Sequence, residues 1–214
     1  MFMSSTMRNF FTARILLLVV LPCTAASPAA AQNDRSAQKK DTNASSEIHQ
    51  LFVADQDERR SWGSKTFTDE EIKQAEERDA KRRERAKQIY LSGGLKTGRD
   101  YYDAALLFQH GDQPDDYLLA HVLATVGIAK GNTDCRWMAA ATLDRFLQSL
   151  KQKQVFGTQF IGQDNRYTYE PYDATLLTDD VRKAMDVPVL AQQQKDLDDM
   201  NKNAPPEKPA SSEK

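Results

Sequence analysis

Apolar residues recur at helical spacing through the middle of the chain, and they define the predicted core. We expect three helices there, at 100–110, 114–130 and 133–150, with Gly111 and Gly131 ending the first two. Because the joints are only two to four residues long, consecutive helices should pack as antiparallel neighbours. The middle segment is apolar almost all round, which predicts that it is the buried central helix.

Two further helices are predicted before this core. A short one covers 47–60, with one apolar face. A longer one begins at Thr68, where Thr68 and Glu71 form the pattern of a capping box, and it ends near Ser92. The basic run at 81–83 is interleaved with acids on all sides, so we interpret it as a solvated helix face rather than an anion site.

After Lys153 the apolar period changes. The pattern predicts a small hairpin around the turn 163–165, a short helix after Thr178, and a last helix from Pro188 to about Asn201. The predicted fold is therefore mainly α: a small antiparallel domain of about six or seven helices with one short β-hairpin.

The N-terminal stretch has the pattern of a secretory signal peptide. Arg8 and Arg14 precede the apolar run 15–21, and small residues follow, with cleavage expected after Ala31. The run is shorter than the roughly 20 residues that span a bilayer, which disfavours the alternative of an uncleaved anchor. Lipidation at Cys23 is the third alternative, and the preceding proline disfavours it. The expected location is the periplasm or the medium.

Composition divides the whole chain into four predicted segments. The 214 residues suit one domain with appendages. We predict a signal peptide at 1–31, a disordered linker at 32–46, a helical domain at 47–201 and a disordered tail at 202–214.

Charge and cysteine content narrow the function classes. Removing residues 1–31 takes two arginines and no acid from 29 Lys+Arg and 31 Asp+Glu, and leaves a formal net charge of −4. That balance argues against nucleic acid as a partner. After signal cleavage no membrane span is expected. Cys135 would remain alone, without an internal disulfide, and its apolar neighbours indicate a small buried side chain rather than a nucleophile.

No strong catalytic or cofactor motif is present. The sequence lacks a glycine-rich phosphate loop, an H-E-x-x-H segment and a Cys-His metal spacing. Its three histidines, His49, His110 and His121, fall in different predicted helices, whereas a zinc site needs at least three converging ligands. We therefore expect neither a metal nor a cofactor.

Three polar residues in the helical core are candidate catalytic groups: His110, Asp144 and Arg145. His110 stands at a helix C-terminus, where it could act as a general base or simply cap the helix. Asp144 and Arg145 lie among apolar neighbours, as do Asp55 and Arg59, and a half-buried ion pair is the alternative for each.

Four short motifs recur in order: Asp55-Gln56-x-x-Arg59, Gln109-His110, Asp144-Arg145 and Gln154-x-Phe156-Gly157-Thr158-Gln159. Together they resemble a bacterial family of uncharacterised domains, over roughly 47–200. The family typically has tyrosine where this chain has Phe156, and the long charged helix is inserted between the first two motifs. The resemblance implies positions and no mechanism. The binding candidates are Asp55, Gln56, Arg59, Gln109, His110, Arg145, Thr158 and Gln159.

Two functional hypotheses follow. The first is a helical binding or interaction module, whose partner is a protein or a small polar ligand. The alternative is a hydrolase-like enzyme, with His110 as base and Arg145 as charge stabiliser. The convergence of these dispersed residues on one cavity would favour a site, and their scatter over separate faces would remove it.

Overall fold

The computed structural model describes residues 28–62, 67–163 and 166–203, and its side chains from Asp41 onwards. The chain divides into two units, 1–36 and 37–214, and the helical domain belongs to the second. Residues 1–27 of the predicted signal peptide and 204–214 of the predicted tail lie outside the described residues. No helix in the described ranges combines the length and apolar character that a membrane crossing needs.

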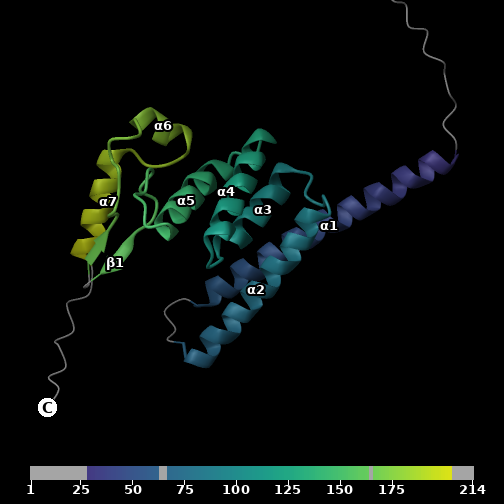
Figure 1. Ribbon diagram of the computed structural model, residues 1–214, viewed down its shortest axis with the longest axis horizontal. Coiled ribbons are helices and arrows are strands. Elements are labelled where there is room, and N and C mark those ends of the chain that lie inside the picture. Colours follow the sequence, from purple (N-terminus) through teal and green to yellow (C-terminus); the bar gives the residue numbers. More distant parts are fainter. Residues whose placement is uncertain (1–27, 63–66, 164–165, 204–214) are drawn as a thin grey trace, which may run out of the picture. The chain divides into compact units, whose positions relative to one another are not determined.

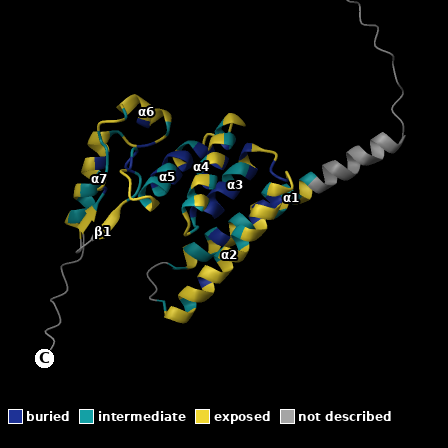
Figure 2. Cartoon of the chain, viewed as in Figure 1, coloured by how far each residue is buried: buried dark blue, intermediate teal, exposed yellow. Residues whose placement is uncertain are grey.

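From residue 37 onwards, α1 (Pro28–Trp62) lies in unit two, where it pairs side by side with α2 (Asp69–Leu91). Ion pairs join Glu47 to Arg85 and Glu58 to Arg78, so their directions are antiparallel. The predicted capping box begins α2, with Thr68 as the N-cap residue. Figure 2 shows that the outward surface of this pair is largely exposed.

The segment 32–46, which we expect to be a linker, is part of α1 in the described residues. Its last turns are held against α3 (Gly98–Gln109) and the residues that precede it. Asp41 forms an ion pair with Lys96 at 3.4 Å, Ala44 packs on the core, and Ser45 hydrogen-bonds Asp100. These are contacts between distant segments, which the local polarity of the sequence does not reveal.

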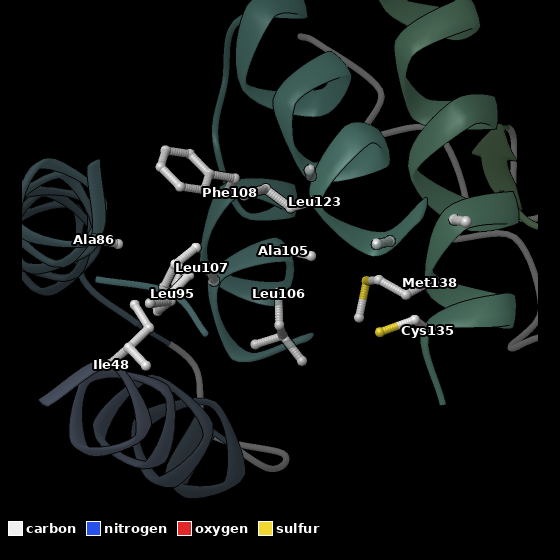
Figure 3. Close-up of a cluster of buried hydrophobic side chains, with 14 of the residues drawn as sticks. Ile48, Ala86, Leu95, Ala105, Leu106, Leu107, Phe108, Leu123, Cys135 and Met138 are labelled. Carbon is white, nitrogen blue, oxygen red and sulfur yellow. The ribbon is translucent and has the colours of Figure 1, made fainter. Parts of the chain in front are cut away.

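The core is built around α3, with α4 (Pro114–Ala129) and α5 (Cys135–Ser149) beside it. Figure 3 shows Ile48 of α1 and Ala86 of α2 on one side of α3, and Met138 of α5 on the other. Close approach of α4 and α5 depends on Gly127, because a Cβ there would lie 2.3 Å from the Cys135 sulfur.

The central helix is α3 rather than α4, which corrects the sequence interpretation. Nine of the 12 residues of α3 are buried, including its polar Asp103 and Gln109. In α4 only four residues are buried, and Leu118 and Val122 are 40% and 45% exposed. An apolar circumference therefore does not by itself decide which helix lies at the centre.

The C-terminal part forms a small layer beyond the end of α5. It contains the antiparallel pair β1 (Ile161–Gln163) and β2 (Arg166–Thr168), then α6 (Asp179–Ala184) and α7 (Leu190–Lys202). The predicted hairpin is confirmed, although its strands are shorter than expected. A fully buried Arg182 binds the Phe156 carbonyl at 2.9 Å and thereby ties α6 to the chain that leaves α5. In the described ranges the fold is thus mainly helical, with seven helices and one two-stranded sheet.

Candidate functional site

The first polar cluster joins α1 to the end of α3. The Nδ1 atom of His110 lies 3.1 Å from Asp55 Oδ2 and 2.9 Å from Arg59 Nε. Arg59 Nε also lies 3.2 Å from Asp55 Oδ2, which confirms the predicted ion pair one helical turn apart. His110 is at the C-cap position of α3, but its ring reaches across to α1 instead of capping.

The electrostatics of this cluster are dominated by Asp55, which is 1% exposed. Burial alone would raise the pKa of Asp55. The hydrogen bond from His110, the positive charges of His110 and Arg59, and a hydrogen bond from Gln56 outweigh burial and lower the pKa to about 2. The carboxylate is therefore ionised at neutral pH. His110 Nδ1 lies within hydrogen-bonding distance of both this carboxylate and Arg59 Nε, and among the described residues no hydrogen bond reaches Nε2.

Charged side chains of α2 surround this cluster. Asp79 accepts from Arg59 at 2.7 Å and also pairs with Arg82, which binds Glu58 at 2.7 Å. Arg83 donates to the backbone carbonyl of His110 at 3.0 Å. The solvated-face interpretation of 81–83 is therefore wrong for Arg82 and Arg83, whose side chains are only 11% and 16% exposed.

A pocket of about 510 Å³ opens beside this cluster, and we name it the His110 pocket. Its lining includes His110, Arg83 and Asp112, together with Asp79 and Glu76 of α2. Because acids and bases both face it, the pocket has no single charge preference.

The second polar cluster is built on Asp144, which is fully buried in α5. Its Oδ1 atom accepts from the backbone N–H groups of Val155 and Phe156 at 2.8 and 3.0 Å. Its Oδ2 atom accepts from the backbone and the hydroxyl of Thr158 at 2.9 and 2.8 Å. All its acceptor capacity thus serves the loop 155–159, and Asp144 positions that loop rather than facing a pocket.

The backbone of the loop 155–159 requires a glycine at position 157. Gly157 has φ +71°, and a Cβ there would lie 2.8 Å from Tyr172 Cζ, so only glycine fits without strain. Gln154 is fully buried and accepts from the backbone N–H of Gln159 at 2.9 Å. The Gln159 amide nitrogen in turn donates to Thr158 Oγ1 at 3.0 Å.

This loop forms one wall of a second pocket, of about 440 Å³, which we name the Arg145 pocket. Its lining is polar: Arg145 and Gln148 of α5, Gln159 of the loop, Tyr117 of α4, and Asp112. Tyr117 is fixed by its hydroxyl, which donates to the Gly111 carbonyl at 2.8 Å. Asp112 also lines the His110 pocket, so the two pockets adjoin at this residue.

Arg145 differs from the other arginines of these clusters. Burial lowers the pKa of its guanidinium, Tyr117 raises it, and the charge of Arg59 lowers it again. Its Nε atom is buried and has no hydrogen-bond partner among the described residues. The predicted ion pair with Asp144 is therefore absent in this part of the chain, because Asp144 is fully engaged by the loop.

The structure brings together part of the predicted site. His110, Arg145 and Gln159 line the two adjoining pockets, from three separate segments. Asp55, Gln56 and Arg59 are joined by hydrogen bonds in the cluster that contacts His110. Thr158, the neighbour of Gln159 in the loop, donates to Asp144. Gln109 is buried on α3 and lines neither pocket.

Tyr117 and Gln148 are among the pocket residues that sequence analysis missed. Gln148 lies one helical turn after Arg145, on the same face of α5, which is a signal that the sequence does contain. Tyr117 carries no such local signal, because its role depends on the approach of α4 to α5.

The other candidate groups lie elsewhere. His49 pairs with the buried Asp103 at 2.8 Å, and His121 lies 2.9 Å from the carbonyl of Ala139. Cys135 is buried, and burial with the nearby Asp134 and Asp103 raises its thiol pKa to about 11. Among the described side chains, no three His, Cys, Asp or Glu residues are placed to hold a metal ion.

Comparison with protein families, with curated proteins and with solved structures finds no match. The resemblance to a bacterial family therefore stays a prediction, and the geometry of the two pockets is what bears on function.

Proposed function

We propose that this chain is a helical binding module that works outside the cytoplasm and holds a small polar ligand in the Arg145 pocket. The observation that carries the proposal is convergence. Residues from α4, α5 and the loop 155–159 present Tyr117, Arg145, Gln148 and Gln159 to one cavity, although they are far apart in sequence.

The size of the cavity supports a small ligand. Pockets for small molecules enclose roughly 300–1,000 Å³, and they carry a few fixed polar groups that set orientation. The Arg145 pocket, at about 440 Å³, is within that range. Its polar lining favours a ligand with several hydrogen-bonding groups over an apolar one.

The walls of the pocket are held before any ligand arrives. Asp144 accepts four hydrogen bonds from the loop, and Tyr117 is fixed to the Gly111 carbonyl. A ligand therefore does not have to order the loop, and the entropy cost of binding is lower than for a mobile loop.

The test is a screen by nuclear magnetic resonance on the uniformly ¹⁵N-labelled chain. The probes are single amino acids, monosaccharides, nucleosides, dicarboxylic acids and sugar phosphates. We expect at least one class to shift amide signals of 145–149 and 155–159, with a weaker effect in the Gln159→Ala variant. The control is Gln50→Ala, which removes an exposed side chain of α1. Shifts confined to other surfaces, or none with any class, would contradict a ligand site here.

A hydrolase is the second candidate, and the His110–Asp55 contact of 3.1 Å favours it. With Asp55 in contact with Nδ1, Nε2 would take a proton from water while the water oxygen adds to the carbonyl carbon of an ester. The bond from that carbon to the leaving oxygen would then break, and Nε2 would return the proton to the leaving oxygen. Assays with p-nitrophenyl acetate and p-nitrophenyl phosphate test this. Turnover that falls at least 100-fold in His110→Ala would support it, and equal turnover in both proteins would exclude His110 as the base.

A further inference from the structure

Two nitrogen donors on α5 are buried without partners. They are Nε of Arg145 and Nε2 of Gln148, and neither has a hydrogen-bond partner within the described part of the chain. Both residues line the Arg145 pocket. A buried donor without an acceptor costs free energy, because the hydrogen bond that it makes to water in the unfolded chain is lost on folding.

The charge of Arg145 is also uncompensated. Arg145 forms no ion pair with any described residue, whereas Arg59, Arg82 and Arg182 each lie within 4 Å of a carboxylate. The nearest acid in sequence, Asp144, is used entirely by the loop. A guanidinium stays protonated in proteins, so the site carries a fixed positive charge.

One acid does line the Arg145 pocket, and it does not neutralise this charge. Asp112 is exposed, and its Oδ1 atom accepts from Gln113 Nε2 at 3.2 Å. The charge of Arg59 adds to the positive potential that Arg145 experiences. A cationic ligand would meet repulsion here, and a neutral one would leave the guanidinium without a counter-charge.

We infer that the Arg145 pocket binds an oxyanion group, a phosphate or a carboxylate, through Arg145 and Gln148. This inference rests on the proposed function and names the chemical class of its ligand. The two residues are three apart on one face of α5, so one anion can accept from both donors. The planar fork of arginine suits two oxygens of the same group, and the Gln148 amide supplies a further donor.

The experiment is titration calorimetry of the purified chain with sodium phosphate and, separately, with sodium acetate, at constant ionic strength set with chloride. We expect saturable one-to-one binding of at least one of the two anions. Arg145→Gln should weaken it at least tenfold, and Gln148→Ala by about threefold to tenfold. The control Arg136→Gln removes an exposed arginine from the same helix and should leave the affinity unchanged. The tighter of the two anions identifies the group that the natural ligand carries.

A stability measurement separates binding from folding. Because Arg145 has no described partner, Arg145→Gln should melt no lower than the wild-type chain without anion, and phosphate or acetate should raise the melting temperature of the wild type only. A variant that melts much lower would show that Arg145 is structural, and the inference would fail. Absence of binding by either anion, or equal binding by Arg145→Gln, would also overturn it. The proposed function would survive such a failure if the screen found a neutral ligand in the same pocket.

Discussion

The substitution Asp55→Asn tests the charge cluster around His110. Asp55 is ionised, almost fully buried, and surrounded by His110, Arg59 and Gln56. Its pKa falls from 3.8 to about 2 in the fold, although burial alone would raise it. Since one pKa unit corresponds to about 1.4 kcal/mol, ionised Asp55 stabilises the fold by about 2.4 kcal/mol.

The sign of the pH effect follows from this direction. The pKa of Asp55 is lower in the folded state, so its contribution is fully present above pH 4 to 5. It is lost as the pH falls from there towards 2, and roughly half of it remains at pH 3.

The assay is urea denaturation, followed by circular dichroism, at pH 7, 4, 3 and 2. The unfolding free energies of the wild type and Asp55→Asn should differ by about 2.4 kcal/mol more at pH 7 than at a pH well below 2, and most of that change should occur between pH 4 and 2. The matched control is Asp57→Asn, because the Asp57 side chain is 63% exposed and pairs only with Arg60 on the same helix in the described ranges. It should change the free energy by less than about 1 kcal/mol. A wild-type advantage that stays constant from pH 7 to 2 would refute the reasoning.

Three further predictions concern the loop and the thiol. Asp144→Asn turns an acceptor-only group into one that presents an N–H to the loop, and should lower the unfolding free energy by about 2–4 kcal/mol in urea titrations, with a smaller loss refuting its role as an anchor. Gly157→Ala should cost about 1–3 kcal/mol by the same method, because φ is +71° and the new Cβ would meet Tyr172. Cys135, whose pKa burial raises to about 11, should react with a thiol reagent at pH 8 only as the chain unfolds in urea, and fast labelling of the folded protein would contradict its burial.

The helices could be predicted because each has a local cause. The apolar period and the capping box at Thr68 predict where α2 begins. Gly111 and Gly131 predict the breaks between the next three helices. The N-terminus of α3 was placed two residues late, at Asp100, because the capping box of Thr97 and Asp100 surrounds a glycine that is a poor helix former. Which helix is the most buried could not be predicted from the sequence, because α3 is covered on both sides by segments that are distant along the chain.

The site was predictable only in outline. His110, Arg145 and Gln159 were recognised as polar residues in unexpected places, and all three line a pocket. Their partners were not recognised. Asp79 and Arg59, which form an ion pair, are 20 residues apart along the chain. Asp144 and Thr158, which are joined by hydrogen bonds, are 14 residues apart. Sequence spacing carries no information about such contacts beyond a helical turn.

The carbonyl of Phe156 gives the last helix of the fold a part in building the Arg145 pocket. It accepts from Arg182 at 2.9 Å and from Gln193 at 2.7 Å, so α6 and α7 clamp the base of the loop 155–159. A chain shortened to end before Gln193 would lose the donor from α7, and of these two donors only Arg182 would still hold the Phe156 carbonyl. The shape of the Arg145 pocket then depends on a helix that contributes no residue to its lining.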